Sequence, residues 1–188
     1  MLLFINACTR KNSRTKKLAD CLLKTLGLPY EELKITDCEF DKADEDFLIK
    51  RDEILRHGDF EKLKYAKQFA EADKIVIAAP FWDLSFPAVL KTYIEQINAV
   101  GITFRYTPQG IPEGLCRADR LYYVTTAGGD FFPEIYGFGY IKALAENFYG
   151  IKDVELIKAS GLDIEGADTE KILLDCEKDI IRRFQPNK

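Results

Sequence analysis

Two kinds of hydrophobic pattern alternate along the chain. Short runs of consecutive apolar residues are typical of strands buried on both faces, and apolar residues at every third or fourth position are typical of amphipathic helices. We predict strands at residues 2–7, 30–35, 75–79, 120–126 and 154–159. We predict helices at residues 13–26, 44–72 with a break near Gly58 and Asp59, 87–100 with Gly101 as its C-cap, 140–149 and 169–184.

The regular alternation of strands and helices predicts a parallel sheet with helices on both faces. Five strands fit the flavodoxin-like strand order 2-1-3-4-5. No linker, repeat or low-complexity segment divides residues 1–188, which predicts a single α/β domain. The segment 104–116 is the longest connection without either periodicity, and such loops are often functional.

Composition narrows the class of protein. The net charge of -4 argues against nucleic acid and anionic membranes as partners, and no apolar stretch is long enough for a transmembrane helix. A single histidine, His57, and five cysteines without a CxxC pair form neither a zinc pattern nor a histidine-based triad. We expect a cytoplasmic protein without a signal peptide, with reduced and mostly buried thiols, an exposed His57 and a solvated acidic stretch at residues 41–46.

Three segments follow predicted strands and therefore meet at the carboxyl edge of the sheet, where this fold binds ligands. Residues 8–15 offer the hydroxyls of Thr9, Ser13 and Thr15 together with a helix N-terminus, which suits a phosphate group. A helix cap formed by Ser13 without any ligand is an equally good interpretation. The segment matches neither a Walker loop nor a GxGxxG loop, so a bound phosphate would belong to a mononucleotide.

The other two segments are aromatic and glycine-rich. Residues 80–87 contain three aromatic side chains, among them the only tryptophan, Trp82, and they suit the edge and face of a planar ring. Residues 125–130 contain Gly128 and Gly129, which let a ligand approach the backbone. Aromatic packing, a partner surface and an ordinary glycine turn are the alternatives. The convergence of three such segments at one edge of the sheet favours a ligand site.

Two longer motifs carry a resemblance to a known family. The segment PAVLKTYIE at residues 87–95 resembles the helix after the third strand in FMN-dependent NAD(P)H:quinone oxidoreductases and azoreductases. The segment GITFRYTPQG at residues 101–110 is similar to the G-x-T-F-x-Y-T-x-x-G signature of that family, and the run TAGG at residues 126–129 matches as well. These matches span residues 1–130, whereas the rest of the chain fits by pattern only.

The resemblance implies a site for one noncovalently bound FMN. The implied contacts with its phosphate are Thr9, Ser13, Arg14 and Thr15. The implied contacts with its isoalloxazine ring are Pro80, Phe81, Trp82, Asp83 and Leu84. The implied contacts with the pyrimidine edge of that ring are Thr126, Ala127, Gly128 and Gly129. Tyr106 and Phe131 are implied on the substrate side. The chain departs from the family at Asp83, where azoreductases commonly have Asn, at Thr9, where many members have Ser, and at residues 130–132.

The implied activity is transfer of two electrons, as hydride, from NAD(P)H through FMN to a quinone, an azo compound or a nitroaromatic, with no metal and no catalytic side chain. The resemblance also implies a homodimer, for which residues 81–86 and 131–138 supply apolar surface. The alternatives are a flavodoxin-type electron carrier with protein partners and an interaction module that has lost FMN. Asp83 either caps the helix near Pro87 or meets solvent, or its charge lies close to the flavin.

Overall fold

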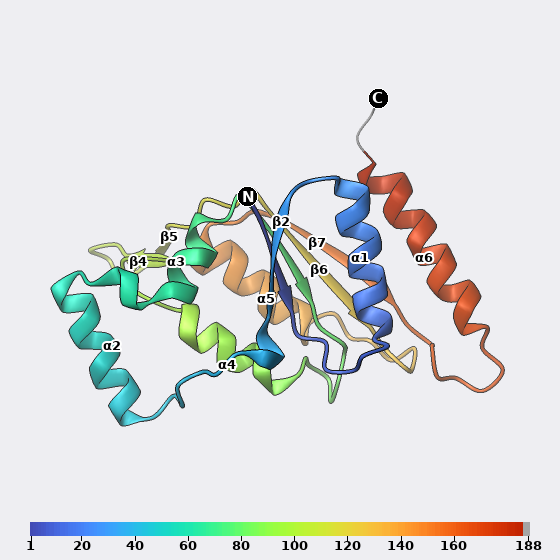
Figure 1. Cartoon of the computed structure of the whole chain (residues 1–188), viewed down its shortest axis with the longest axis horizontal. Coiled ribbons are helices and arrows are strands. Elements are labelled where there is room, and N and C mark those ends of the chain that lie inside the picture. Colours follow the sequence, from blue (N-terminus) through green and yellow to red (C-terminus); the bar gives the residue numbers. More distant parts are fainter. Residues whose placement is uncertain (186–188) are drawn as a thin grey trace.

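The computed structural model describes residues 1–185 and contains the predicted parallel sheet (Figure 1). Its strands are β1 (Leu2–Asn6), β2 (Tyr30–Lys34), β3 (Lys74–Ala78), β6 (Arg120–Thr126) and β7 (Asp153–Ala159). All neighbours pair in parallel, in the order β2-β1-β3-β6-β7. Because β6 and β7 are the fourth and fifth strands of this sheet, the predicted flavodoxin-like order is confirmed. The predicted domain extends to residue 188, and residues 186–188 lie outside the described part of the chain.

Helices cover both faces of the sheet (Figure 1). They are α1 (Arg14–Leu26), α2 (Glu45–His57), α3 (Lys64–Glu71), α4 (Ala88–Ile97), α5 (Phe138–Leu144), which continues into a π-helical turn at Ala145–Tyr149, and α6 (Thr169–Phe184). Short 3-10 turns lie at Ile35–Asp37 and Phe60–Lys62. Helices α1 and α6 pack on one face, whereas α3, α4 and α5 pack on the other, so the sheet separates two hydrophobic cores.

The helix ends follow from local sequence. In α1, the Ser13 hydroxyl accepts a hydrogen bond from the Lys16 N–H, and Gly27 ends the helix in the left-handed conformation. Between these ends, Leu18, Leu22 and their neighbours are buried against the sheet. Full burial of one leucine side chain stabilises the fold by about 1.5–3 kcal/mol, so this apolar stripe fixes α1 and the loop before it.

Helix α4 is shorter than predicted. It ends at Ile97, with Asn98 as its C-cap, and the expected C-cap Gly101 lies in the following turn. The buried Thr103 hydroxyl explains the difference, because it donates a hydrogen bond to the Ile97 carbonyl (2.8 Å) and accepts one from the Ala99 N–H (3.2 Å). A side chain thus takes the place of the next helical turn.

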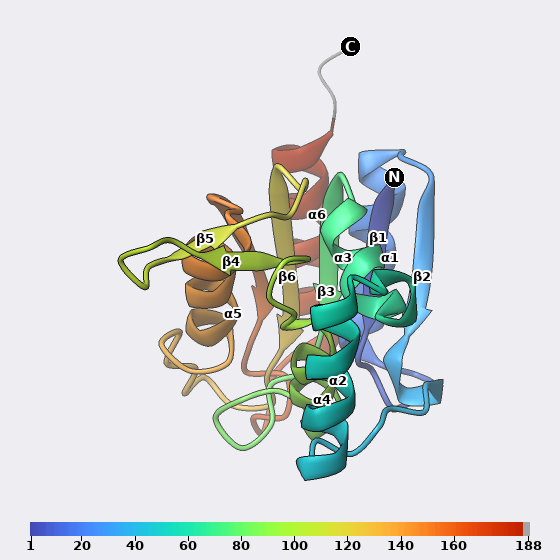
Figure 2. The ribbon, with the colours of Figure 1, turned by 90° about the vertical axis from the view of Figure 1, so that its left-hand side faces the viewer.

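The segment predicted to lack regular structure contains a small hairpin. Strands β4 (Phe104–Tyr106) and β5 (Pro112–Gly114) pair antiparallel and project beside α5 (Figure 2). The hairpin docks through the Phe104 ring, whose centroid lies 5.0 Å from that of Phe148. Strands of three residues are too short to show a hydrophobic periodicity in the sequence.

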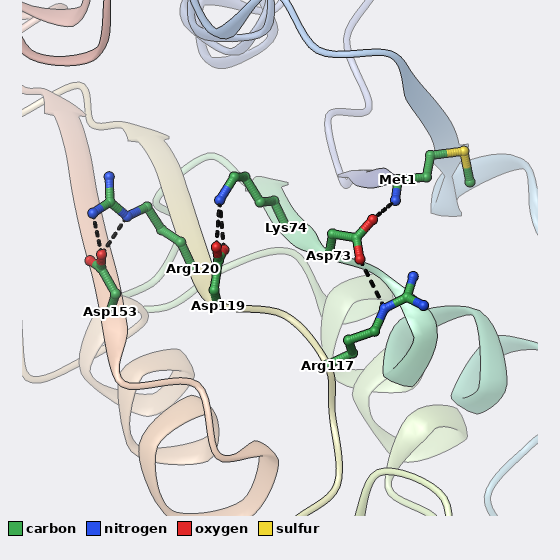
Figure 3. Close-up of polar contacts among 7 residues, drawn as sticks. All are labelled: Met1, Asp73, Lys74, Arg117, Asp119, Arg120 and Asp153. Carbon is green, nitrogen blue, oxygen red and sulfur yellow. Dashed lines mark hydrogen bonds and ion pairs between the residues drawn. The ribbon is translucent and has the colours of Figure 1, made fainter. Parts of the chain in front are cut away.

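Ion pairs connect neighbouring strands at the amino edge of the sheet (Figure 3). Asp73, just before β3, contacts the amino group of Met1 and the Arg117 guanidinium. The Lys74 ammonium binds both oxygens of Asp119 at 2.7 and 2.8 Å, and Arg120 pairs with Asp153. Exposed pairs of this kind contribute at most about 1 kcal/mol each, but they lie opposite the edge at which ligands are expected.

The exposure of His57, of the acidic stretch and of the cysteines was also predicted from the sequence. His57 is exposed, and the acidic stretch is an exposed loop in which Asp44 caps α2, as predicted. All five cysteines are free thiols, but only Cys8 is buried and the other four are half-buried, so the prediction of mostly buried thiols was wrong. Within residues 1–185, no helix combines the length and apolar character needed to cross a membrane.

Candidate functional site

A cavity of about 370 Å³ opens at the carboxyl edge of the sheet. Its walls come from the loops that follow β1, β3, β6 and β7. The lining residues are Thr9, Arg10, Asn12, Ser13, Arg14, Thr15, Pro80, Phe81, Trp82, Asp83, Thr126, Ala127, Gly128 and Asp163. The three segments that the sequence analysis selected therefore meet around one cavity.

The loop between β1 and α1 forms the end of the cavity that is rich in hydrogen-bond donors. Within the described residues, the backbone N–H groups of residues 9–12 and of Arg14 and Thr15 donate no hydrogen bond. Such unsatisfied N–H groups at a helix N-terminus form an anion-binding site. Ser13 caps α1, so the helix-cap interpretation holds, and its hydroxyl also faces this cavity.

A buried hydrogen bond joins the first turn of α1 to the end of strand β6. The Thr15 and Thr126 hydroxyl oxygens lie 2.6 Å apart, and both side chains are buried. This bond holds the start of α1 against the end of β6 and so fixes the width of the cavity between them.

The loop after β3 forms the opposite wall. The Phe81 N–H donates to the Thr126 carbonyl at 2.9 Å, which continues the pairing with β6 beyond the end of β3 at Ala78. The Phe81 ring packs against Phe132, with the ring centroids 4.4 Å apart. Pro80 is buried and Trp82 is 38% exposed, so the wall presents aromatic surface that is rigid at its base and open to solvent at its rim.

A two-residue turn follows this wall. Trp82 and Ser85 exchange backbone hydrogen bonds of 3.0 and 2.7 Å, and the residues between them, Asp83 and Leu84, have φ values of 51° and 62°. Left-handed backbone in a leucine costs roughly 1–2 kcal/mol. Strain of this size gathers at functional sites. The turn also corrects one interpretation of Asp83: α4 has Pro87 as its N-cap and no side-chain capping bond, so Asp83 does not cap it.

The glycine loop after β6 is covered by a residue that the sequence analysis missed. Asp163 lies so close to Gly128 that a Cβ atom there would come within 3.2 Å of the carboxylate carbon. The same carboxylate pairs with the Arg14 guanidinium at 2.8 Å, and a second Arg14 N–H donates to the Leu162 carbonyl at 3.1 Å. Asp163 follows β7, and the adjacency of β7 to β6 was the signal that could have pointed to it.

The predicted site residues divide into two groups. All the predicted cofactor contacts line the cavity except Leu84 and Gly129. Leu84 instead borders a neighbouring groove of about 570 Å³, which it shares with Asp83. Tyr106 and Phe131, predicted on the substrate side, are exposed and lie outside the cavity wall. Besides Asp163, the sequence analysis missed Arg10 and Asn12, which lie in the loop that it had already selected.

Among the described residues that line the cavity there is no cysteine and no histidine. Burial raises the pKa of the Cys8 thiol, which lies beside this loop and is held toward the Ala78 carbonyl at 3.7 Å. A raised pKa keeps the thiol protonated and therefore unreactive at neutral pH. Among the described residues, no cluster of three potential metal ligands is present. The arrangement thus suits binding and orientation of a ligand that brings its own chemistry.

The fold and this cavity define a flavodoxin-like protein with a donor-rich cavity at the carboxyl edge of its sheet. The chain belongs to the family described by the flavodoxin-like fold, whose model matches residues 1–184. It is 37% identical to an FMN-dependent NADH:quinone oxidoreductase from Clostridium beijerinckii, covering 95% of this chain and 96% of that protein.

Two further proteins are similar to this chain. A second relative, FMN-dependent NADH:quinone oxidoreductase 2 from Clostridium acetobutylicum, is 39% identical and covers 89% of this chain and 88% of its own length. An azoreductase structure from Bacillus anthracis superposes with a TM-score of 0.84 at 25% identity, covering 99% of both chains. The family resemblance seen in the sequence motifs is therefore confirmed.

Proposed function

We propose that this protein is an FMN-dependent NAD(P)H oxidoreductase that reduces quinones, azo compounds or nitroaromatics by two electrons. The observation that carries the proposal is that the two ends of the cavity differ: free backbone donors lie at one end, and an aromatic wall with glycines lies at the other. That arrangement fits a mononucleotide with a planar ring. Both relatives named above carry FMN and quinone reduction in their names, which supports the same conclusion.

The residues fit FMN in a definite orientation. Thr9, Ser13, Arg14 and Thr15 would hold the phosphate, with Arg14 held in place by Asp163. Pro80, Phe81, Trp82, Asp83 and Leu84 would border the isoalloxazine ring. The pyrimidine edge would meet Thr126, Ala127, Gly128 and Gly129, where the N–H groups of Gly128 and Gly129 donate no hydrogen bond within residues 1–185.

Bound FMN would supply two-electron redox chemistry between NAD(P)H and the acceptor. The side chains of this protein would bind and orient it: the donor-rich loop would hold the phosphate, and the aromatic wall would border one face of the ring. Phe131, which is exposed just after the glycine loop, would border the acceptor, and the family resemblance implies the same for Tyr106, which is exposed on β4.

The identity of the flavin is the first test. We expect about one FMN per chain, measured by mass spectrometry of the released flavin, and FAD in most sites would contradict the proposal. Ser13→Ala should weaken FMN binding by about 1–3 kcal/mol, the scale for a lost hydrogen bond to a charged group. Because Ser13 also caps α1, the thermal stability of the FMN-free protein is measured in parallel as the control.

Kinetics separate the enzyme from its main alternative. If one open face of the flavin serves both substrates, initial rates with NAD(P)H and a benzoquinone give parallel double-reciprocal lines. Intersecting lines would argue for simultaneous binding. A flavodoxin-type electron carrier, which acts on protein partners, would show no steady-state turnover with NAD(P)H.

We also propose that the protein is a homodimer in the cytoplasm. Phe131 and Ile135 are each 74% exposed beside the cavity, which is unusual for side chains this apolar and typical of an interface. Five free thiols agree with a reducing compartment.

A further inference from the structure

Asp83 places an isolated charge at the mouth of the cavity. Among residues 1–185, it alone borders both the cavity and the adjacent groove lined by Leu84, Phe86, Tyr136 and Tyr140. Its side chain is exposed, and within residues 1–185 it makes no ion pair and no hydrogen bond. Any molecule that reaches the aromatic wall from the groove passes this carboxylate.

The other charges that border these two spaces are paired or belong to the donor-rich loop. Arg14 and Asp163 neutralise each other, and Lys91 in the groove pairs with Glu95. Arg10 belongs to the donor-rich loop at the phosphate end. Asp83 is therefore the charge at the aromatic end of the cavity that has no partner among residues 1–185.

The turn also fixes where this charge lies. Asp83 and Leu84 occupy the two central positions of the turn, closed by the hydrogen bonds between Trp82 and Ser85. A two-residue turn of this kind leaves its central residues little backbone freedom. The carboxylate is therefore held at one place beside the groove.

We propose that Asp83 selects the electron acceptor by charge, so that neutral and cationic acceptors are favoured over anionic acceptors with the same ring system. This inference rests on the proposed oxidoreductase function and names the class of acceptor that the site takes. The effect of one exposed charge on another is modest because water screens it. We expect a threefold to tenfold discrimination.

The test uses two quinones as electron acceptors, each measured with the wild-type holoenzyme and with the Asp83→Asn variant. The pair is 1,4-naphthoquinone and its 2-sulfonate, and the measured quantity is the ratio of kcat/KM for the sulfonate to that for the neutral quinone. Asp83→Asn should raise this ratio threefold to tenfold, and the gain should shrink in 1 M NaCl, where the Debye length is about 3 Å. A quinone with a quaternary ammonium group should show the opposite change.

The substitution is a clean one for two reasons. Asn tolerates the left-handed backbone about as well as Asp, so the turn is kept. Any change in the driving force of the flavin affects the neutral and charged quinones alike and cancels in the ratio. Asp175→Asn removes one charge from the exposed side of α6 and serves as the matched control, with an unchanged ratio expected.

A binding measurement provides a readout that does not depend on turnover. Naphthalene-2-sulfonate and 2-naphthamide are titrated by calorimetry, and Asp83→Asn should tighten the sulfonate threefold to tenfold without affecting the amide. An unchanged sulfonate-to-neutral ratio in both experiments would overturn the charge selection. Absence of turnover with every quinone would instead contradict the proposed function, while the calorimetry would still decide the role of Asp83.

Discussion

At the scale of single residues, the position of the Asp163 carboxylate depends on the absence of a side chain at Gly128. The space that a side chain at 128 would need is filled by the Asp163 carboxylate, which is also the partner of Arg14. A glycine is therefore required here for close packing, whereas its neighbour Gly129 has nothing closer than 4.0 Å to its absent Cβ. The two adjacent glycines have different roles.

Gly128→Ala should displace Asp163, break its pair with Arg14 and weaken FMN binding about tenfold, equivalent to about 1.4 kcal/mol. Gly129→Ala, the matched control, should change affinity by less than about twofold. The measurement is flavin fluorescence on titration of the FMN-free protein. In an Asp163→Ala background, Gly128→Ala should lose most of its effect, because the clash has been removed. An undiminished effect there would mean that the added methyl group obstructs the ligand directly.

Asp83 should also tune the bound cofactor, because it lines the cavity and flavin reduction adds negative charge. Two unit charges about 4 Å apart interact by roughly 4 kcal/mol at an effective dielectric constant near 20. Water and delocalisation over the ring reduce this to about 1–2 kcal/mol, and about 1.4 kcal/mol equals about 30 mV for two electrons. Asp83→Asn should raise the midpoint potential by about 20–40 mV in an equilibrium dye titration. A change below about 10 mV with FMN bound would leave Asp83 a solvent contact only.

At the scale of elements, the β4–β5 hairpin is held by a contact between two glycines. The absent Cβ of Gly114 would overlap the backbone of Tyr149 and Gly150 at the end of the π-helical turn. This close approach brings Phe104 against Phe148, and Tyr106 packs edge-on against Phe104 with 5.5 Å between the ring centroids.

Gly114→Ala should undock the hairpin, because backbone atoms cannot move aside as a flexible side chain can. Overpacking typically costs about 1–3 kcal/mol, and the loss should fall mainly on residues 104–114. Hydrogen exchange followed by mass spectrometry should show faster exchange of that segment, with β1 and β3 unchanged. Gly110→Ala, in the hairpin's own turn with no neighbour within 4 Å, separates local backbone strain from undocking. Equal exchange in both variants would exclude the docking role.

The elements with a long hydrophobic pattern could be predicted from the sequence. The elements whose bounds depend on tertiary contacts could not. The bounds of α6 and β6 agree with their apolar patterns, since a sixteen-residue stripe and a buried seven-residue run leave little ambiguity. The end of α4 depends on a hydroxyl six residues away, at Thr103, and the β4–β5 hairpin on packing against the π-helical turn. Similarly, most of the cavity wall follows from strand ends, whereas Asp163 enters through an ion pair that no motif encodes.

At the scale of the whole molecule, the two edges of the sheet have different compositions. The amino edge is held by ion pairs between neighbouring strands (Figure 3). The carboxyl edge has free donors, aromatic side chains and exposed apolar residues. The apolar surface lies next to the cavity, along residues 131–140. An interface there would place two sites close to one symmetry axis.

The dimer prediction follows from this surface. Light scattering at micromolar concentration should give about twice the 21.5 kDa chain mass. Ile135→Glu should shift the protein toward monomer, because a charge at the centre of an apolar interface is costly. Leu174→Glu, an equally drastic change at a 49% exposed position on α6, should leave the mass unchanged. A wild-type mass near that of one chain would contradict the prediction.

The strained turn at Leu84 has a consequence for the evolution of this protein. A leucine with φ of 62° makes the native state less stable than a glycine would at the same place, and at 43% exposure its side chain regains little by burial. Selection for thermal tolerance alone would therefore remove it. A variant library screened only for heat resistance should accumulate glycine or asparagine at position 84, and libraries screened for turnover should retain the leucine. Residue 84 thus offers a simple record of which pressure a lineage has experienced.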